Sequence, residues 1–352
     1  YHRIKAAHPE MLLFFRLGDF YEMFFEDAVV GSRELEITLT SRNTDKEGNP
    51  IPMCGIPYHA MATYVTRLLK KGYRVAVCDQ VEDPKSAKGV VRREVTRILT
   101  PGTAVEEGFC ESKENNYLAS VSLSENSVGL CFCDLSTGEL WAAEFTGPER
   151  EIRVSEAFSQ FSPREVLVPE NPPDPWRDRL AGWLAEGALK TARPAWHFNR
   201  DWAHRRLLEH FGVTTLEGLD LDRRPEAVGA VGALLEYLQE TQKRQAGHVR
   251  RIRLLEDDSF LRMDEATIRN LELVQGLDGN RRWTLLAILD RTRTAMGARL
   301  LRRWILRPSL VPSEIQARLD AVAELQQDVV RLGGLTSVLE NIHDLERLVG
   351  RI

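Results

Sequence analysis

Long apolar runs are missing from this 352-residue chain. No stretch reaches the roughly 20 consecutive apolar residues that a membrane-spanning helix needs, and no charged-then-apolar signal opens the chain. Hydrophobic residues make up 43% and charged residues 28% of the sequence, which is typical of a globular protein. Because this length exceeds what one hydrophobic core usually serves, we expect two or three domains. The start at Tyr1 and a helical pattern at residues 344–348 lead us to expect a piece of a longer protein.

Cysteines are few, and their spacing suits neither a disulfide framework nor a zinc site. The five thiols make an odd number and contain no C-x-x-C pair. We therefore expect reduced thiols, as in a cytosolic protein. Two of them alternate along one predicted strand, so they share a face of it and fit small core positions. The five are Cys54, Cys78, Cys110, Cys131 and Cys133, of which the last two are the alternating pair.

Catalytic motifs are missing as well. The chain has no G-x-x-x-x-G-K-[ST] phosphate loop, no G-x-S-x-G nucleophile elbow and no H-E-x-x-H zinc motif, and its eight histidines are scattered. The sequence therefore predicts neither a catalytic residue nor a metal site. One alternative stays open, because Asp134 at the end of a predicted strand could belong to a metal-dependent nuclease. We favour an Asp that caps the turn Ser136-Thr137-Gly138, since Asp is common at turn entry.

Residues 1–103 alternate strand and helix patterns and predict a small mixed α/β domain. Short apolar or alternating runs predict its strands, and apolar residues at 3–4 spacing predict its helices. One of these helices would start after Gly18-Asp19, and another would stop at Gly72. The expected elements are strands at 11–15, 36–40, 74–78 and 94–99, a three-turn helix through 21–28, a helix at 60–71 and a Gly/Pro-rich loop at 43–52.

Residues 104–242 predict a second α/β domain, and residues 243–352 predict the start of an all-helical one. Polar turns separate three regularly spaced strands, which indicates a β-meander, and helical periodicity dominates from about residue 227. The clearest helix follows Pro312 and would begin with a capping box, Ser313-x-x-Gln316. The expected elements are strands at 117–123, 128–134, 139–145 and 166–168, then helices at 264–275, 284–290, 296–306 and 313–330.

Charge is distributed unevenly along the chain, although the net charge is only −5. Residues 1–103 carry +2, residues 104–242 carry −11, residues 243–307 carry +7, and residues 308–352 carry −3. The first and third segments could therefore face phosphates, whereas DNA would repel the acidic second segment.

The stretch Leu17-Gly18-Asp19-Phe20-Tyr21-Glu22-Met23-Phe24 is the richest in candidate functional residues. As a helix start, Asp19 would be the N-cap and Glu22 would complete a capping box. Phe20 is out of step with the apolar stripe of that helix and would project from the front of the domain. A lone exposed aromatic residue is common, so the pattern alone leaves a functional and a structural interpretation open.

Several motifs in the chain resemble those of the MutS family of DNA mismatch-recognition proteins. The resemblance covers essentially the whole chain, and its first two motifs are long and specific. The motifs are His8-Pro9-Glu10 running into Gly18-Asp19-Phe20-Tyr21-Glu22-Met23-Phe24, Ile51-Pro52-Met53-Cys54-Gly55-Ile56-Pro57-Tyr58-His59-Ala60, Thr100-Pro101-Gly102-Thr103, Asp264-x-x-Thr267-x-Arg269-Asn270-Leu271-Glu272 and Thr294-Ala295-Met296-Gly297-x-Arg299.

The resemblance implies a fold and a function. It implies a mismatch-binding domain, a connector that resembles the RNase H fold, and the start of a helical core and lever domain. It also implies that Phe20 and Glu22 form a Phe-x-Glu reader of mismatched or looped-out bases, inserted from the minor groove with kinking of the DNA. ATP, Mg²⁺ and the homodimer contact would belong to a C-terminal ATPase domain beyond these residues. A downstream repair protein of the MutL type and a bacterial cytoplasmic, nucleoid-associated location are further expectations.

Basic and apolar residues near the predicted reader are candidates for holding the DNA. Phosphate contacts would position the duplex without reading its sequence. Two other classes of function stay open: an RNase H-like nuclease, and a protein-interaction scaffold that does not bind DNA. The candidates for the DNA backbone are Arg42, Lys88, Arg92 and Arg93, and those for the sugar edge are Leu17 and Met53.

Overall fold

The computed structural model divides the chain into two compact units, each of which contains a six-stranded sheet. The first unit is Tyr1–Cys110 with Leu235–Ala246, and the second is Glu111–Leu234 with Gly247–Ile352. The structure describes residues 1–44, 47–82, 91–105, 108–109, 111–174, 176–183, 187–242, 247–255 and 259–350.

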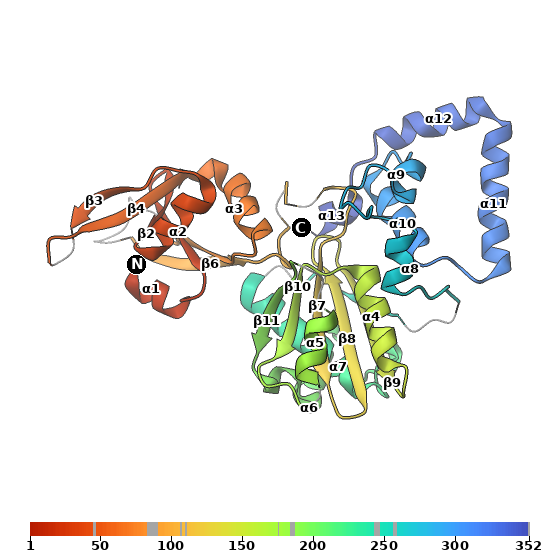
Figure 1. Cartoon of the computed structure of the whole chain (residues 1–352), viewed down its shortest axis with the longest axis horizontal. Coiled ribbons are helices and arrows are strands. Elements are labelled where there is room, and N and C mark those ends of the chain that lie inside the picture. The colour runs from red at the N-terminus through yellow and green to blue at the C-terminus, as the bar shows by residue number, and fades with distance from the viewer. Residues whose placement is uncertain are drawn as a thin grey trace. The chain divides into compact units, whose positions relative to one another are not determined.

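The first unit is built around a mixed sheet with the strand order β3-β4-β2-β1-β5-β6. Strands β1 and β2 form an antiparallel hairpin, and β1 also pairs in parallel with β5, which begins more than 50 residues later in the chain. These elements are red to orange in Figure 1. Their bounds are α1 (His2–Ala7), β1 (Leu12–Leu17), β2 (Phe20–Phe24), α2 (Glu26–Leu35), β3 (Thr40–Thr44), β4 (Pro50–Pro57), α3 (Met61–Lys70), β5 (Val75–Gln80) and β6 (Arg93–Leu99).

Helices cover the two faces of this sheet unequally. Alternate residues of each strand point to opposite faces. Leu12 and Phe14 of β1 are buried in one cluster with apolar residues of α2 and α3, whereas Leu13 packs on the other face beside Ile4 of α1. The helix prediction at 60–71 and the strand predictions at 11–15, 74–78 and 94–99 are therefore confirmed to within a few residues.

The prediction of a helix through residues 21–28 is wrong in its first half, because Phe20–Phe24 is strand β2. Tyr21 and Met23 are buried and alternate with Phe20 and Glu22, which is the period of a strand. Pairing with β1 on one side and β4 on the other satisfies the backbone of β2, and helix α2 begins only at Glu26. The predicted capping box of Asp19 and Glu22 therefore does not form. The predicted strand at 36–40 is also displaced, since β3 covers Thr40–Thr44, and β4 occupies the end of the predicted 43–52 loop.

The second unit contains the predicted β-meander in a sheet of order β11-β10-β7-β8-β9-β12. The predicted strands at 117–123, 128–134, 139–145 and 166–168 are confirmed with shifts of at most one residue at each end. The elements up to the end of the sheet are β7 (Tyr117–Leu123), β8 (Ser127–Asp134), β9 (Glu139–Thr146), α4 (Arg150–Phe161), β10 (Glu165–Pro169), α5 (Trp176–Trp183), β11 (Leu189–Arg193), α6 (Arg200–Phe211), α7 (Pro225–Gln242, of which residues 235–242 belong to the first unit) and β12 (Arg251–Leu254).

Helices lie on both faces of this second sheet (Figure 1). Apolar residues of α4 and α5 share one buried cluster with alternate residues of the meander. The start of α7 presses on the opposite face so closely that a Cβ on Gly129 would lie 2.0 Å from the carbonyl oxygen of Glu226. Only glycine fits this contact, and the carboxylate of Glu144 accepts hydrogen bonds from the first backbone N–H groups of α7. Cys131 and Cys133 are free and fully buried, in agreement with their predicted core role.

Strand β12 contradicts the prediction that residues 243–352 are all helical. Its four residues pair in parallel with β9, so Arg251 lies opposite Glu139. In the sequence, Ile252 and Leu254 alternate with arginines, and this pattern is too short to be recognised without its partner strand. The second unit thus holds parts of two predicted domains, and the boundaries 1–103, 104–242 and 243–352 stay predictions.

The remaining elements are helices, as predicted, but their ends differ. The predicted capping box does not form at the start of α11, because the helix begins at Pro312 and its N-cap is Val311, which has no polar side chain; Gln316 donates to Asp320 instead. The predicted 313–330 helix is interrupted at Asp328, whose carboxylate caps the next helix. The helices are α8 (Glu265–Asn270), α9 (Leu285–Leu289), α10 (Ala295–Leu306), α11 (Pro312–Gln327), α12 (Val329–Glu340) and α13 (Leu345–Val349).

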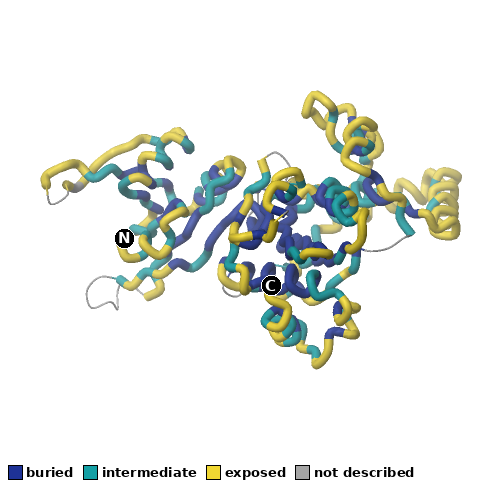
Figure 2. Tube along the Cα trace, turned by 60° about the horizontal axis from the view of Figure 1, so that its bottom comes forward, coloured by how far each residue is buried: buried dark blue, intermediate teal, exposed yellow. Residues whose placement is uncertain are grey.

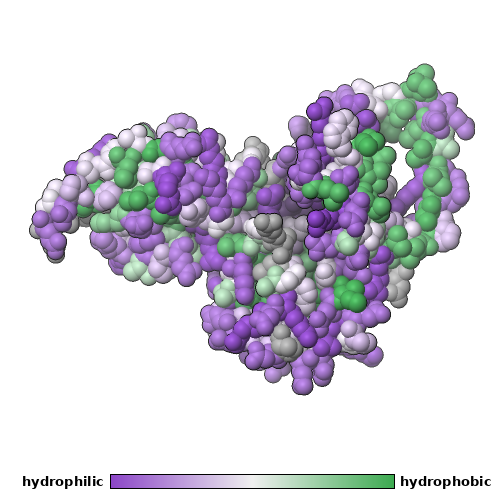
Figure 3. Space-filling view, viewed as in Figure 1, coloured by the Kyte–Doolittle hydropathy of each residue, from purple (hydrophilic) through white to green (hydrophobic). Residues whose placement is uncertain are grey.

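Helices α11 and α12 bury no residue within the part of the chain that the structure describes. Both helices are largely yellow in Figure 2, and apolar side chains follow α11 in Figure 3. The predicted stripe of α11 is therefore exposed, with Leu319 at 56% and Val322 at 64%. Among the described helices, none combines the length and the apolar character needed to cross a membrane.

Candidate nucleic-acid interface

Phe20 stands at the tip of the β1–β2 hairpin and, among the described residues of the first unit, is one of two exposed phenylalanine or tyrosine residues. The other is Tyr58, which follows strand β4. The two strands are joined by Gly18 and Asp19, and Leu17 pairs with Phe20 at the start of the ladder. Gly18 has a φ of +59°, a backbone conformation that glycine adopts without strain. The side chain of Phe20 is 47% exposed, as the sequence predicted, although it is carried by a strand and not by a helix.

Phe20 and Glu22 lie on the same face of β2, because they are two residues apart in a strand. Tyr21 and Met23 point to the opposite face, where α2 and α3 cover the core. Gly55 of β4 lies directly opposite Glu22. Because Gly55 has no side chain, the side chain of Glu22 has room to lie across β4. The structure thus brings the two predicted reader residues together on one rigid surface.

Arg42 of β3 forms a long ion pair with Glu22. Its Nη1 atom lies 4.0 Å from Oε1 of Glu22, and the Arg42 side chain is 75% exposed whereas that of Glu22 is 13% exposed. A pair this long, with one partner in solvent, contributes little to stability. Glu22 therefore does not hold the Arg42 side chain firmly in place.

The other basic candidates differ from Arg42 in their surroundings. Arg93 donates hydrogen bonds to the carbonyl oxygens of Arg16 (2.9 Å) and Val91 (3.0 Å), which identifies it as an arginine that holds the fold together. Arg92 is exposed, but it forms an ion pair with Glu94 that offsets its charge. Lys88 lies outside the described residues.

The two apolar candidates, Leu17 and Met53, differ in their exposure. Leu17 is partly exposed and lies beside Phe20 at the hairpin tip. Met53 is only 8% exposed and pairs with Phe24, so a sugar contact would require its side chain to move.

A second aromatic residue, Tyr58, lies at this tip, and the sequence alone predicts no role for it. Tyr58 is 47% exposed, and the guanidinium of Arg16 stacks on its ring at 3.9 Å from the centroid. The Tyr58 backbone N–H donates to the carbonyl oxygen of Asp19 at 2.9 Å, which ties it to the turn before Phe20. The motif that contains Tyr58 was visible in the sequence, but only the hairpin brings it beside Phe20.

A partly buried polar network supports strand β2 behind the tip. The Tyr21 hydroxyl donates to Oδ1 of Asp79 at 2.6 Å, and the Thr96 hydroxyl donates to Oδ2 at 2.5 Å. Burial, together with the hydrogen bond to Asp79, raises the pKa of Tyr21 to about 12. This network connects β2 to β5 and β6 through side chains.

Asp134 is a turn cap, as the favoured interpretation predicted. Its Oδ1 atom accepts hydrogen bonds from the backbone N–H and hydroxyl of Ser136, at 2.9 and 2.6 Å. Its Oδ2 atom accepts from the Asn115 side chain at 2.7 Å and from the Asn116 backbone at 3.2 Å. Both oxygens are thus engaged by protein donors, and the described ranges contain no group of three or more His, Cys, Asp or Glu residues arranged to hold a metal ion.

Comparison with known proteins gives one consistent result along the chain. Family models match in chain order: MutS domain I matches residues 1–108, MutS domain II matches residues 116–250, and MutS domain III matches residues 266–352. The chain is 46% identical to a protein of Symbiobacterium thermophilum named DNA mismatch repair protein MutS, over 100% of the chain and 40% of that protein. Proteins of the same name from Solibacter usitatus and Myxococcus xanthus are each 45% identical to it over the whole chain, which spans 40% and 39% of their lengths.

Proposed function

The chain belongs to the MutS family of DNA mismatch repair proteins, and from this premise we propose that its first unit binds mismatched or looped-out bases in duplex DNA. Phe20 is the wedge that enters from the minor groove, and Glu22 beside it discriminates between mismatched and normal pairs. The observation that supports this proposal best is an exposed phenylalanine at a braced hairpin tip, with a carboxylate two residues away on the same face.

The energetics explain why such a wedge selects weak sites in a duplex. Inserting an apolar side chain unstacks a base step at a cost of a few kcal/mol, and bending the duplex costs on the order of 1–6 kcal/mol. Stacking of the ring on a base returns roughly 1–3 kcal/mol. A mismatch has already lost part of its pairing and stacking energy, so net binding occurs mainly there. One site can then serve many different mismatches.

Glu22 contributes selectivity because its charge is unfavourable next to DNA. A carboxylate near phosphates is tolerated only if it accepts a hydrogen bond from a displaced base N–H, or if it takes up a proton and donates. Both options require a base with a free edge. Arg42, 4.0 Å from Glu22, reduces the repulsion and supplies a phosphate contact on the same face.

The remaining functions that the family implies concern parts of a longer protein. We propose that the second unit contains a connector domain with an RNase H-like fold and the start of a core and lever domain. ATP hydrolysis with Mg²⁺, homodimer formation and contact with a MutL-type partner would then be activities of the longer protein in the bacterial cytoplasm. This chain has no phosphate-loop motif, so we assign none of its residues to ATP.

A direct test compares binding of the chain to a duplex with one mismatch and to the matched duplex of otherwise identical sequence. Fluorescence anisotropy at several salt concentrations should show tighter binding to the mismatch, and an affinity that falls as salt rises. Equal affinities for the two duplexes would contradict the proposal. Absence of any DNA binding would favour an interaction scaffold, and cleavage of the duplex that depends on added Mg²⁺ would favour a nuclease.

A further inference from the structure

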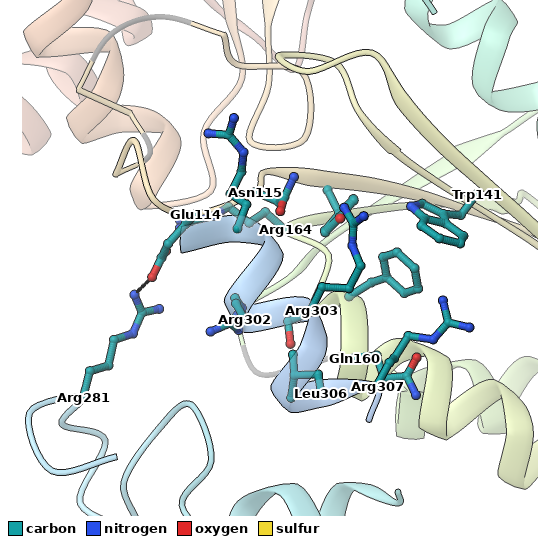
Figure 4. A pocket seen from close by; sticks show the side chains of 14 residues that line it. Glu114, Asn115, Trp141, Gln160, Arg164, Arg281, Arg302, Arg303, Leu306 and Arg307 are labelled. Atoms are coloured by element: carbon teal, nitrogen blue, oxygen red, sulfur yellow. Dashed lines mark hydrogen bonds and ion pairs between the residues drawn. The ribbon is translucent and has the colours of Figure 1, made fainter. Parts of the chain in front are cut away.

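A pocket rich in arginine lies in the second unit, where α10 meets the sheet. Its cavity volume is about 100 Å³, and its walls come from α10, the end of α4, the β7 and β9 strands and the segment before β7. Figure 4 shows Arg302, Arg303 and Leu306 of α10 around this pocket. Six arginines line it: Arg164, Arg281, Arg299, Arg302, Arg303 and Arg307.

Nearby carboxylates neutralise some of these arginines. Arg299 forms ion pairs with Asp344 at 2.7 Å and with Glu346 at 2.6 Å, and its side chain is 2% exposed. Burial opposes the charge of Arg299, but these partners raise its pKa above the ordinary value. Arg303 binds Glu139 at 2.5 Å, so its charge is also matched.

Glu114 is the only carboxylate among the residues that line the pocket, and two arginines share it. Arg281 forms an ion pair with Glu114, drawn as a dashed line in Figure 4, and Arg164 lies 3.9 Å from the same carboxylate. The lining is therefore short of negative charge.

Arg302 has neither an ion pair nor a hydrogen bond among the described residues. Burial, together with repulsion from Arg281, lowers the pKa of Arg302 from 12.5 to about 10. A guanidinium in such surroundings is held at an energetic cost unless an anion compensates it. Arg302 thus marks the point of the pocket where negative charge would be most favourable.

Trp141 adds an unused donor to the same pocket. Its indole is 8% exposed, and its Nε1–H has no acceptor within the described ranges. Arg307 lies over the Trp141 ring, with its guanidinium carbon 5.3 Å from the centroid. The pocket therefore holds two side chains whose donors have no acceptor among the described residues, Arg302 on α10 and Trp141 on β9.

We propose that this pocket binds a phosphate group, either as inorganic phosphate or as the phosphate of a small nucleotide. A tetrahedral oxyanion presents several acceptor oxygens at once, which the donors on α10 and β9 can share. A cavity of about 100 Å³ has room for one such group, given that a single water molecule needs only roughly 10–15 Å³ of such cavity volume. The site belongs to the second unit and does not depend on the mismatch-reading role of Phe20.

The binding test titrates the chain with sodium phosphate in chloride buffer at constant ionic strength, by isothermal calorimetry and by thermal unfolding. Wild type should show one saturable site and a melting temperature that rises with phosphate. Arg302→Met should weaken binding by about tenfold or more, because a hydrogen bond to a charged group is lost. Trp141→Phe should weaken it by a smaller factor.

Two controls separate a built site from a general charge effect. Arg282→Met removes an exposed arginine that lies over Trp283 and does not line the pocket, so it should bind phosphate like wild type. Arg302→Met should melt no lower than wild type in chloride, because no ion pair is lost. If wild type and Arg302→Met titrate alike, or if Arg282→Met loses as much affinity, phosphate is an adventitious ion only and the proposal is wrong.

The source of the phosphate is resolved by competition. Adenosine monophosphate that displaces inorganic phosphate and binds more tightly would support a nucleotide, whereas failure to compete would support free phosphate. A short DNA duplex that binds through Arg302 while neither small phosphate binds would overturn the proposal, since the pocket would then contact the DNA backbone.

Discussion

Glu22 and Gly55 lie opposite each other in the β2–β4 ladder, and a Cβ added to Gly55 would lie 3.4 Å from Cγ of Glu22. That separation is ordinary van der Waals contact, so a methyl group at residue 55 would fit beside Glu22, whereas a larger side chain would displace it. The position of the Glu22 carboxylate thus depends on a small residue in the neighbouring strand.

Gly55→Val should therefore lower the ratio of mismatch to match affinity nearly as much as Glu22→Ala. The branched side chain fits a strand but displaces Glu22 from its place across β4. Gly55→Ala is the matched control and should keep most of the ratio. Anisotropy titrations with both duplexes give the measurement, and a wild-type ratio in Gly55→Val would show that the position of Glu22 does not matter.

Phe20→Ala should weaken mismatch binding by about 10- to 100-fold, since the stacking of one base is worth roughly 1–3 kcal/mol. Its free energy of unfolding should change little, because the side chain is 47% exposed. Trp196→Ala removes an exposed aromatic residue of the second unit and serves as the control that keeps wild-type affinity. If Phe20→Ala binds the mismatched duplex as tightly as wild type does, Phe20 is not the wedge.

Arg42→Ala should change DNA affinity, whereas Arg93→Ala should change stability. Arg42 is exposed, so its loss should weaken matched and mismatched binding by similar factors and reduce the salt slope by about 1, with stability kept. Arg93 donates to two backbone carbonyl oxygens, so its loss should lower the free energy of unfolding by about 1–3 kcal/mol. Urea unfolding and salt-dependent anisotropy separate the two, and an unchanged salt slope in Arg42→Ala would argue against a phosphate contact.

Gly18→Ala should destabilise the chain by roughly 1 kcal/mol, because residue 18 has a positive φ that a side chain disfavours. The hairpin tip would deform with it, so mismatch affinity should fall as well. Gly333→Ala, within helix α12 and with nothing within 4 Å of the added Cβ, should instead be neutral or slightly stabilising. Urea unfolding of both variants is the measurement, and equal effects would contradict the strained-turn explanation.

Stability should fall as pH rises from 10 to 12, partly through Tyr21. Its pKa is raised from 10.0 to about 12 in the folded chain, so the neutral hydroxyl is favoured there. The contribution is complete below pH 10 and is lost as pH rises through 12. Tyr21→Phe should start less stable and lose less over this interval. If urea unfolding shows that wild type and Tyr21→Phe lose the same free energy of unfolding between pH 10 and 12, other groups are responsible.

The sequence predicts helices and strands well where neighbouring residues carry the signal. It predicts them less well where pairing with a distant strand decides the conformation. Polar turns at 124–126 and 136–138 delimit the meander, so its strands could be predicted almost to the residue. Residues 21, 24, 25 and 28 fit a helix as well as a buried strand followed by a helix start. What decides between them is the pairing of β2 with β4, about 30 residues later, which no local pattern contains.

The candidate site was predicted in part for the same reason. The exposure of Phe20 could be inferred because its position is off the apolar stripe, although the stripe was assigned to the wrong kind of element. The stacked pair of Arg16 and Tyr58 depends on contacts between separate motifs and could not be inferred. Arg302 is one of many arginines in a basic segment, and only the folded pocket shows that it has no counterion within the described part of the chain.

Strand β12 also has a consequence for how the chain can be shortened. It pairs with β9 along Glu139–Ala142, so without it β9 becomes the outer strand of the sheet, with unpaired N–H and C=O groups. Outer strands of this kind add further strands from other molecules. A version that ends at residue 242 should therefore self-associate edge to edge, and one that ends after Leu254 should resist this association. Both versions contain the acidic residues 104–242, so the difference between them would come from the strand and not from net repulsion.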